Sequence, residues 1–484
     1  MQTICHLSVL IHEQAKKYGA KPVLTFRNFG SLTWKTVSWN QFSMRVKEVS
    51  NALLNLGVKP QETIGVFSQN CIQYLYTDFG AYGVRAISIP FYATSSEQQI
   101  QYMIQDAGIR FLFVGEQEQY DKARRIQSLC PSLERIIVFD SSVRLSQHDP
   151  NSIYFEDFLK LGEGFPREAE VEERWVQANE EDTCNILYTS GTTGESKGVV
   201  LTYKMYHAAL RANAKSVPLN DKDRVINFLP FSHVFERGWA YLALSLGSEL
   251  IINTYPKEIQ QSMRETHPTC MAAVPRFWEK VYIGVRDKIE RSPSPIRKVM
   301  LHAIRIGERY FFDYVNEGKR PPLWLQAMYK LYDKTLFAKV KAAVGLQRGR
   351  FFPTAGAAVS PEIARFFRSI GIPMCVGYGL SETTATVSSM PMIGFDLNSV
   401  GVIMPALEVK IDPMSSEILI KGSTVFSGYY NNPEANAEAF TEDGFFRTGD
   451  AGRLEGDTLY FTERLKDLFK TANGKYIAPQ MLEG

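Results

Sequence analysis

A run of glycine, hydroxyl and lysine residues, Tyr188 to Gly198, offers the clearest chemistry in this sequence of 484 residues. It reads Y-T-S-G-T-T-G-E-S-K-G. Glycines let backbone N–H groups approach a ligand, and hydroxyls and a lysine can contact the oxygens of a polyanion. The run follows an apolar strand candidate, residues 184–188, and precedes a helical-looking segment, residues 204–214. A Ser/Gly surface loop is the simpler explanation for a lone glycine-rich run, but this order and flanking favour a phosphate-binding loop.

The loop does not have the spacing of a P-loop. When G-x-x-x-x-G-K-[ST] is started at Gly191, Ser196 stands where the second glycine belongs and Gly198 where the hydroxyl residue belongs. This disfavours a P-loop kinase. The run resembles instead the signature of the adenylate-forming superfamily, which includes acyl-CoA synthetases, luciferases and peptide-synthetase adenylation domains. The resemblance implies that ATP is bound by Thr189, Ser190, Gly191, Thr192, Thr193, Gly194 and Lys197.

A second motif, G-Y-G-L-S-E-T-T, occupies residues 377–384 after the strand candidate 372–376. An aromatic ring between glycines can stack on a flat base, and a carboxylate four residues on can hold Mg²⁺. Alone, the motif would be a turn with a helix cap. The resemblance implies that Tyr378 stacks on adenine, that Glu382 binds Mg²⁺, and that Thr383 contacts the α-phosphate. Gly379 is then expected beside both the nucleotide and the acyl group.

Two more motifs match the superfamily's adenosine site. The small residues Gly356, Ala357 and Ala358 match the segment that flanks adenine and the acyl carbonyl, although such a run also suits tight packing. Asp450, in R-T-G-D, matches the ribose-binding aspartate, and an Asx-turn is its simpler explanation. Arg464 matches the arginine that also reaches the ribose. Glu463 departs from the glycine that the family commonly has there.

The segment L-P-F-S-H-V-F-E-R, residues 229–237, contains a histidine in an apolar run. Such a histidine is more often structural than catalytic. In the superfamily it lines the junction between the carboxylate pocket and the CoA tunnel, so His233 is expected to contact the acyl group and CoA. The following Phe-Glu-Arg and a long helical insertion, residues 285–344, resemble the long-chain acyl-CoA synthetase branch.

The end of the chain resembles the opening of the superfamily's C-terminal lid. Asp467 matches the hinge, and Gly474 matches the glycine that lets pantetheine pass. The family's adenylation lysine is expected beyond Gly484, so we expect adenylation to be impaired in a chain that ends here.

The pattern of apolar segments predicts an α/β fold with mainly parallel, helix-covered sheets, because short strands alternate with helices in the first part. From about residue 394, alternating segments such as 407–411 and 417–421 predict a small antiparallel β subdomain. We expect residues 1–463 to form the N-terminal domain, with two α/β subdomains to about 393 and the β subdomain at 394–463. Residues 464–484 would be the hinge and the start of the lid. The acidic stretch 163–181 reads as an irregular surface link.

Composition limits the class of protein. An apolar content of 45% over this length suits a chain with more than one buried core. The six cysteines form no C-x-x-C pair, which predicts free thiols and a cytoplasmic protein. We expect no signal peptide and no membrane span, since no apolar run is long enough.

Charge is unevenly distributed. Residues 276–350 contain 17 Lys/Arg and 7 Asp/Glu in a chain whose net charge is +2. This excess suggests contact with an anionic membrane surface, guidance of ATP and CoA, or solvated helix faces. A helix over residues 296–315 would pack through Leu301, Ile304, Phe311 and Val315. Trp239, Trp278 or Trp324 would stand at the mouth of an acyl tunnel.

Together these motifs predict an ATP-dependent long-chain fatty acid:CoA ligase. It would use ATP, Mg²⁺ and CoA and no nucleic acid, with a homodimer left open. Lys197, His233, Glu382 and Thr383 are the expected catalytic residues, and Thr189 and Glu382 the expected Mg²⁺ ligands. The alternatives are an aryl or medium-chain CoA ligase, an acyl-AMP ligase that loads a carrier protein, and a non-catalytic acyl- or nucleotide-binding module.

Overall fold

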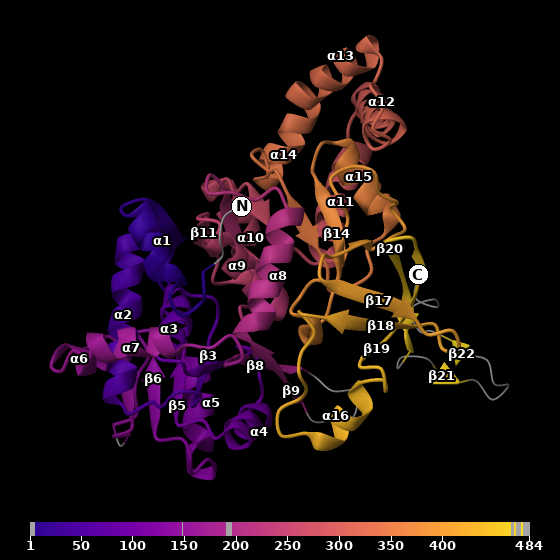
Figure 1. Ribbon diagram of the computed structural model, residues 1–484. Helices are drawn as coiled ribbons and strands as arrows, with labels where there is room; N and C mark the ends of the chain where they lie inside the picture. Colours follow the sequence, from indigo (N-terminus) through magenta and orange to yellow (C-terminus); the bar gives the residue numbers. More distant parts are fainter. Residues whose placement is uncertain (1–4, 148, 190–195, 466–468, 471–475, 478–484) are drawn as a thin grey trace. The chain divides into compact units, whose positions relative to one another are not determined.

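The computed structural model describes residues 5–147, 149–189, 196–465, 469–470 and 476–477 (Figure 1). The chain divides into two compact units. The first comprises residues 1–214, 219–262 and 426–432, and the second comprises residues 215–218, 263–425 and 433–484. The segment 426–432 therefore belongs to the first unit, although the chain on both sides of it belongs to the second.

The first unit contains a seven-stranded sheet in the order β7-β6-β5-β3-β4-β8-β9. Its strands are parallel except for β9, which is antiparallel to β8. The strands β3, β4 and β5 are buried along their whole length, as expected for parallel strands with helices on both faces. They are β3 (Thr63–Phe67), β4 (Ile87–Phe91), β5 (Phe111–Val114), β6 (Arg135–Val138), β7 (Ser152–Tyr154), β8 (Thr183–Thr189) and β9 (Lys197–Thr202).

Two helical layers cover this sheet. On one face, α4 and α5 supply Ile100, Ile104, Tyr120 and Ala123 to a core that includes Ile89 and other strand residues. On the other face, α3 and α6 both pack against α2. The helices are α2 (Trp39–Asn55), α3 (Ile72–Gly83), α4 (Glu97–Ala107), α5 (Gln117–Ile126), followed by the 3-10 turn η1 (Gln127–Leu129), and α6 (Phe155–Glu163).

A second sheet of the first unit runs β10-β11-β1-β2. Here β10, β11 and β1 are parallel, and β2 is antiparallel to β1. The bounds are β1 (Pro22–Phe26), β2 (Lys35–Ser38), β10 (Arg224–Asn227) and β11 (Glu249–Ile252), with helices α1 (Leu10–Tyr18), α7 (Glu168–Gln177), α8 (Tyr203–Ser216), α9 (Val234–Ser245) and α10 (Ile259–Thr266) and the 3-10 turn η2 (Pro256–Glu258).

The second unit contains an eight-stranded sheet in the order β13-β14-β15-β16-β20-β19-β18-β17. Only β13 and β14 form a parallel pair in it, and the other neighbours are antiparallel. Its strands are β13 (Phe352–Thr354), β14 (Met374–Tyr378), β15 (Ser388–Ser389), β16 (Gly401–Ile403), β17 (Leu407–Ile411), β18 (Glu417–Gly422), β19 (Phe446–Glu455) and β20 (Thr458–Arg464). The short strands β12 (Cys270–Met271), β21 (Phe469–Lys470) and β22 (Tyr476–Ile477) complete the strands described.

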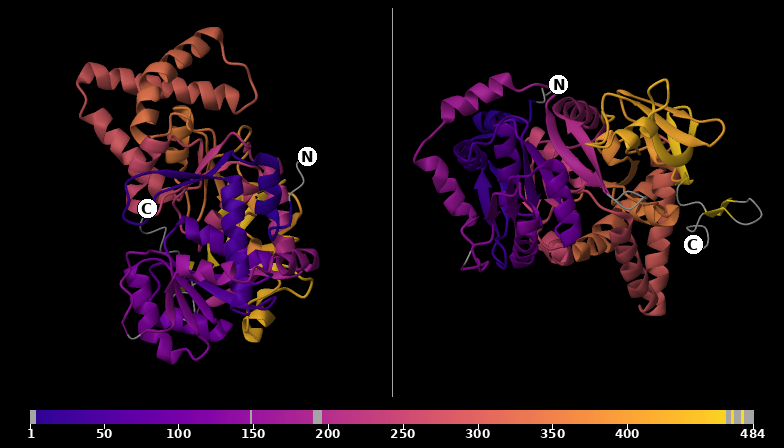
Figure 2. Two further views of the ribbon diagram at one scale, coloured as in Figure 1. Left: turned by 90° about the vertical axis from the view of Figure 1, so that its left-hand side faces the viewer. Right: turned by 90° about the horizontal axis from the view of Figure 1, so that it is seen from below.

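Helices dominate the stretch before this sheet. They are α11 (Pro275–Glu290), α12 (Ser294–Tyr310), α13 (Leu323–Tyr332) and α14 (Ala338–Val344), with π-helical turns η3 (Phe311–Val315) and η4 (Asp333–Phe337). In the later part of the unit lie α15 (Pro361–Ser369), the 3-10 turn η5 (Ser381–Thr383) and α16 (Pro433–Ala439). Figure 2 shows α12 and α13 as a pair of helices lying side by side within their unit.

The predicted α/β fold is confirmed, as is the antiparallel pairing of 407–411 with 417–421. The predicted helical structure of residues 285–344 is also confirmed. The predicted irregular link at 163–181 is wrong, because α7 forms there. Val171 is buried under this helix, and the Arg174 Nη1 donates to the carbonyl oxygens of Val58 at 2.9 Å and Val84 at 3.0 Å. The predicted domain boundaries stay predictions.

The six cysteines are free, and five of them are buried. No helix in the described part of the chain combines the length and the apolar content that crossing a bilayer requires.

Candidate functional site

The predicted adenosine residues follow two neighbouring strands of the second unit. Thr354 at the end of β13 is paired with Val376, near the end of β14. Because the two strands are parallel, Gly356 to Ala358 and the motif from Gly377 onward leave the sheet at the same edge, where ligands of α/β proteins commonly bind. Gly356, Ala357 and Ala358 are exposed, and Gly356 has a φ of +92°. The backbone of this run is therefore open to a ligand.

Tyr378, Asp450 and Arg464 come together in this unit. The Tyr378 hydroxyl donates to Asp450 Oδ2 at 2.7 Å, and Arg464 Nε lies 3.4 Å from Asp450 Oδ1. The register of β19 and β20 explains the ion pair, since Asp450 and Arg464 are cross-strand partners. Burial raises the pKa of Tyr378 well above its usual value, and Asp450 raises it further, so the hydroxyl stays a donor at neutral pH. The cluster combines an aromatic ring, a buried carboxylate and an exposed guanidinium.

Two Tyr378 variants separate its ring from its hydroxyl. Tyr378→Ala removes a stacking surface, so ATP or AMP binding should weaken by roughly 1–3 kcal/mol. Tyr378→Phe keeps the ring but removes the bond to Asp450, so we expect a loss of about 1 kcal/mol. Titration calorimetry with AMP measures both. Tyr460→Phe is the matched control, because Tyr460 lies on the same sheet as Tyr378 and its hydroxyl also donates to an aspartate, Asp396, at 3.1 Å. Equal losses for the Ala and Phe variants of Tyr378 would show that the ring contributes nothing.

The loop after Tyr378 folds back on itself. A Cβ added to Gly379 would lie 1.6 Å from the Ala385 carbonyl oxygen, so only glycine fits there. Thr384 and Ala385 both have positive φ, 52° and 81°, which tightens the return. Thr383 is fully buried, and its Oγ1 accepts from the Leu380 N–H at 3.0 Å. Its hydroxyl is thus engaged within the loop, and its predicted contact with the α-phosphate stays a prediction.

Glu382 lies half-buried on the 3-10 turn η5. Ser381, its half-buried neighbour on the same turn, was not among the predicted site residues. Ser381 is a second hydroxyl residue of this loop that could donate a hydrogen bond to a phosphate. Sequence reasoning missed it because both residue types suit the same chemistry and only the loop's fold distinguishes them.

Thr189 and Lys197 lie in the first unit, where β8 ends and the antiparallel β9 begins. They are cross-strand partners, and Thr189 Oγ1 is 3.4 Å from the Lys197 carbonyl oxygen. Lys197 Nζ lies 5.2 Å from the centre of the Tyr429 ring. The predicted loop residues Ser190, Gly191, Thr192, Thr193 and Gly194 lie outside the described residues, as do Asp467 and Gly474 of the predicted lid.

The segment 426–432 fixes this pair of strands. The Tyr430 N–H donates to the Gly198 carbonyl at 2.7 Å, and Tyr429 bridges to Val199. A Cβ on Gly198 would lie 2.8 Å from Ile186 Cγ2 and 3.3 Å from Tyr430 Cβ. Sequence reasoning missed Tyr429 and Tyr430, because nothing local to residue 430 indicates that it packs on strands more than 200 residues earlier.

His233 is the N-cap of α9 and its Nδ1 accepts from the Phe235 N–H at 3.2 Å. Burial lowers the pKa of His233, so the ring is neutral at pH 7. With Nδ1 accepting, the proton is on Nε2, which is a donor. The loop that carries this histidine is held by Asn70, whose side chain bonds Leu229 O at 2.7 Å and the Phe231 N–H at 2.9 Å.

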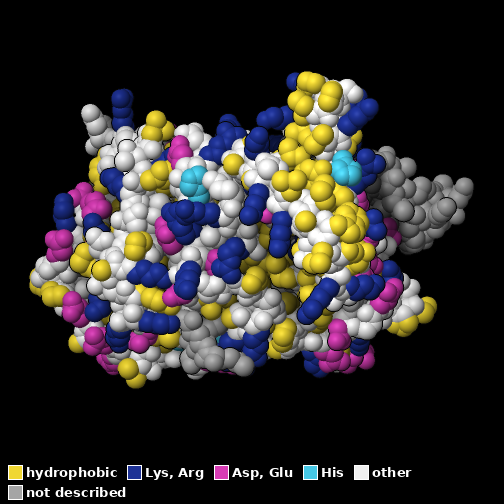
Figure 3. Space-filling model, turned by 90° about the horizontal axis from the view of Figure 1, so that it is seen from above, with side chains coloured by type: hydrophobic (Ala, Val, Ile, Leu, Met, Phe, Trp, Pro, Cys, Tyr) yellow, Lys and Arg dark blue, Asp and Glu magenta, His cyan; other side chains and the backbone are white. Residues whose placement is uncertain are grey.

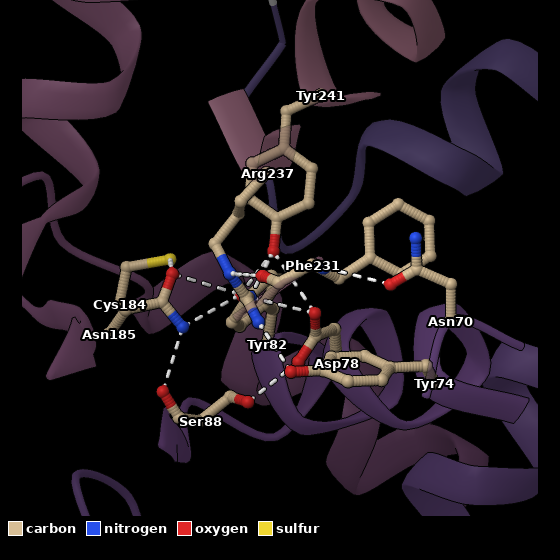
Figure 4. A network of polar contacts seen from close by, with 10 residues as sticks. All are labelled: Asn70, Tyr74, Asp78, Tyr82, Ser88, Cys184, Asn185, Phe231, Arg237 and Tyr241. Carbon is tan, nitrogen blue, oxygen red and sulfur yellow. Dashed lines mark hydrogen bonds and ion pairs between the residues drawn. The ribbon is translucent and has the colours of Figure 1, made fainter. Parts of the chain in front are cut away.

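A buried polar network anchors the same loop (Figure 4). Arg237 Nη1 lies 2.7 Å from Asp78 Oδ2, and both side chains are 1% exposed. Arg237 Nε also donates to the Phe231 carbonyl at 2.9 Å. Around the pair, hydroxyls complete the network: Ser88 donates to Asp78 at 2.6 Å, and Tyr241, Tyr82 and Tyr74 accept from Arg237 at 2.6, 3.1 and 3.3 Å. The Phe-Glu-Arg sequence thus has a positioning role for the residues before it.

Glu236 is fully buried one turn after His233, and Asn227 Nδ2 donates to its Oε1. Burial raises the pKa of Glu236 to about 8. Glu236 Oε2 and Asn227 Oδ1 are both buried without a hydrogen-bond partner in the described structure. Two such acceptors are costly together, and a protonated carboxyl supplies the donor that is otherwise lacking. Glu236 is therefore mainly neutral at pH 7.

This proton predicts a pH-dependent stability. Unfolded Glu236 titrates near 4.5 and folded Glu236 near 8. As pH rises between these values the unfolded state loses the proton and the folded state keeps it, so stability falls, by on the order of 5 kcal/mol in total. Urea denaturation of wild type and Glu236→Gln at pH 5 and pH 8 measures the effect, and the variant should lack this part of the decline. Glu118→Gln, on the exposed face of α5, is the control. Parallel pH profiles for wild type and Glu236→Gln contradict the assignment.

A cavity of about 310 Å³ in the first unit has an acidic lining. It lies beyond the carboxyl ends of β3, β5 and β6, and its lining includes Glu116, Glu118 and Asp140 but no lysine or arginine. None of the predicted site residues lines it. Its carboxylates would repel ATP and CoA, so it is unsuited to either.

The second unit of this α/β fold brings a tyrosine, a buried aspartate and an arginine together, and its motifs are of the adenylate-forming kind. The chain belongs to the AMP-binding enzyme family, which it matches over residues 11–430. The predicted membership of this superfamily is confirmed.

Curated relatives extend over almost the whole chain. The long-chain-fatty-acid–CoA ligase FadD15 of Mycobacterium bovis is 29% identical over 453 residues, covering 93% of this chain and 73% of that protein. Human long-chain-fatty-acid–CoA ligase ACSBG1 is 27% identical over 492 residues, covering 98% of this chain and 66% of that protein. Among solved structures, the anthranilate CoA ligase AuaEII in complex with anthranoyl-AMP has a TM-score of 0.74 at 17% identity, covering 100% of this chain and 82% of that one. This last likeness concerns the fold alone.

Proposed function

We propose that the protein is an ATP-dependent long-chain fatty acid:CoA ligase. The observation that supports it most is the cluster of Tyr378, Asp450 and Arg464, together with the exposed run Gly356 to Ala358 that follows the strand paired with that of Tyr378. An aromatic face, a carboxylate that can accept two ribose hydroxyls and a cation suit adenosine. The names of the two curated relatives supply the substrate class.

In the first step of the proposed reaction, the fatty acid carboxylate attacks the α-phosphorus of ATP. A bond forms between carboxylate oxygen and phosphorus, the bond to the β-phosphate oxygen breaks, and pyrophosphate leaves. Because anions approach each other, the protein acts mainly by positioning and by neutralising charge. Lys197 and the loop hydroxyls would hold the leaving pyrophosphate, and Ser381 or Thr383 would contact the α-phosphate.

Magnesium would be bound at this site together with the phosphates of ATP. Within the described residues no group of three or more His, Cys, Asp or Glu could hold a metal. Mg²⁺ is commonly held by one or two carboxylates together with substrate phosphates and water, and Glu382 and the Thr189 hydroxyl would be its protein ligands. When bound, the ion would offset the negative charge of the phosphates.

In the second step, the CoA thiolate attacks the acyl carbonyl and AMP leaves with the electrons of the broken bond. The neutral His233, with a proton on Nε2, would donate a hydrogen bond to the substrate carboxylate or the acyl carbonyl. Gly379 and the predicted Gly474 would leave room for the acyl group and pantetheine. A cytoplasmic location and a homodimer remain predictions.

Acyl-adenylate analogues test the proposal directly. Calorimetry measures the binding of acyl sulfamoyl adenosines that carry palmitoyl, hexanoyl or benzoyl groups, and it does so whether or not the protein turns over. We expect the palmitoyl compound to bind more than tenfold tighter than the others. Pyrophosphate release with palmitate, with and without CoA, gives the matching activity. Tighter benzoyl or hexanoyl binding would indicate an aryl or medium-chain ligase. Activity that needs a carrier protein instead of CoA would indicate an acyl-AMP ligase. Binding without release from any acid would indicate a non-catalytic module.

A further inference from the structure

The helix pair α12–α13 of the second unit exposes an unusual amount of apolar surface. Six of the seventeen large hydrophobic side chains exposed in the described part of the chain lie within residues 296–331. They include Leu323, 83% exposed, and Trp324, 51% exposed. The six are Ile296, Val299, Leu301, Leu323, Trp324 and Leu331. A concentration of this kind on a protein surface usually marks an interaction site.

The apolar stripe of α12 is longer than the surface that covers it. Ala303, Ile306 and Gly307 are buried, and a Cβ on Gly307 would lie 2.1 Å from the Ser369 carbonyl of α15. Ile296 and Val299 continue the same stripe at helical spacing but are exposed. The predicted anchor Leu301 is wrong, since it points away from this stripe and is exposed. The first two turns of α12 therefore leave apolar surface without a partner.

Helix α13 is apolar on both faces. Its inner face packs through the fully buried Leu325 and through Tyr329, whose ring stacks on Tyr310 at 4.0 Å. Its outer face presents Leu323, Ala327 and Leu331 at four-residue intervals, with Trp324 beside them, and all are exposed. Lys330 is the helix's one charged residue. A helix that is hydrophobic all round is normally covered on both sides.

Cations surround this surface. Across residues 294–332 seven Lys or Arg stand against three Asp or Glu. Arg297, Lys298, Arg305, Lys319 and Arg320 are exposed. Figure 3, which looks onto the top of Figure 1, shows hydrophobic side chains gathered where the pair lies, with Lys and Arg along its margin. The surface is thus apolar at its centre and positive at its edge.

We propose that the outer face of α12–α13 docks on the headgroup region of an anionic phospholipid bilayer. Leucine and isoleucine would enter the acyl boundary, Trp324 would lie at the interface, and the flanking cations would meet lipid phosphates. A second copy of this chain would place this positive margin against another positive margin, which disfavours a symmetric dimer through this face. Docking does not depend on the proposed ligase activity, although a fatty acid dissolved in the bilayer would reach the enzyme by this route.

Vesicle sedimentation tests the proposal on this chain. We expect binding to phosphatidylcholine vesicles to rise when phosphatidylserine is added and to fall toward molar salt, where the screening length is about 3 Å. Leu323→Glu combined with Trp324→Glu should weaken binding at least tenfold on both vesicle types. Lys319→Gln with Arg320→Gln should weaken it about fivefold per charge on anionic vesicles only. All four side chains are exposed, so thermal melts should be unchanged. Leu32→Glu, at a side chain of the first unit that is 77% exposed, is the matched control.

Three results would overturn the proposal. The first is a protein that stays in the supernatant with anionic vesicles at low salt. The second is wild-type vesicle binding by the Leu323→Glu/Trp324→Glu variant. The third is a loss of ATP or CoA affinity in the Lys319→Gln/Arg320→Gln variant with vesicle binding unchanged, which would assign the charge to guiding polyanionic substrates. Ultracentrifugation of the Leu323→Glu/Trp324→Glu variant adds a further check, because dissociation of a dimer would identify a second copy as the occupant.

Discussion

Replacement of Glu382 by glutamine is expected to lower the rate of pyrophosphate release by two to three orders of magnitude. The change keeps the side chain's volume and removes the negative charge that would bind Mg²⁺, an interaction worth several kcal/mol in the transition state, with each 1.36 kcal/mol equal to a factor of ten. Pyrophosphate release at saturating ATP and graded Mg²⁺ measures the effect. Glu382→Asp should retain more activity, since it keeps the charge at a shorter reach.

A binding measurement distinguishes a metal role from a structural one. Glu382→Gln should bind the palmitoyl sulfamoyl adenosine about as tightly as wild type, because that analogue lacks the phosphates that would hold Mg²⁺. Its thermal stability should also be unchanged, since Glu382 is half-buried at the surface of a 3-10 turn. Wild-type activity at low Mg²⁺ would refute the metal role, and a large fall in the melting temperature would show that the residue supports the loop.

The sequence predicted the residues of the short motifs, but it did not predict which of these residues contact one another. Tyr378 and Asp450 each lie in a local pattern with its own chemistry, but they are 72 residues apart. Their hydrogen bond depends on the strand order β14-β15-β16-β20-β19, which no local pattern encodes. The ion pair of Asp450 with Arg464 depends in turn on the register of β19 and β20. Motif reading found the three residues, and the sheet explains why they touch.

Two features of the structure that the sequence did not indicate have identifiable physical causes. Thr383 and Ser381 were indistinguishable in the sequence, but the positive φ values of Thr384 and Ala385 close the loop so that Thr383 is buried. Thr384 and Ala385 are not glycines, so the sequence did not indicate a turn with positive φ at these positions. For α12, Leu301 and Ile304 were as apolar as the residues that pack, and only contact with α15 shows that Ala303 and Ile306 face inward. Local patterns give periodicity, while the partner surface selects the buried face.

The second large effect concerns the ion pair of Asp78 and Arg237. Asp78→Asn should destabilise the protein by about 3–5 kcal/mol, because the guanidinium would remain buried without its counter-charge. The melting temperature of the first unit should fall by roughly 10 °C. The loop from Leu229 to His233 should also become less well ordered, since Arg237 holds the Phe231 carbonyl. Affinity for the palmitoyl sulfamoyl adenosine should then fall along with stability.

The double variant Asp78→Leu/Arg237→Met decides whether the pair itself causes the loss. Removing both charges leaves no uncompensated ion, so this variant should be more stable than either single variant, although Ser88 and the three tyrosines lose partners. Glu13→Gln provides the contrast, because the Glu13–Lys16 pair has the same 2.7 Å separation on the exposed surface of α1 and should be worth less than about 1 kcal/mol. Chemical denaturation of wild type, Asp78→Leu, Arg237→Met and the double variant gives the coupling free energy. A double variant that loses the sum of the two single losses would mean that Asp78 and Arg237 act independently.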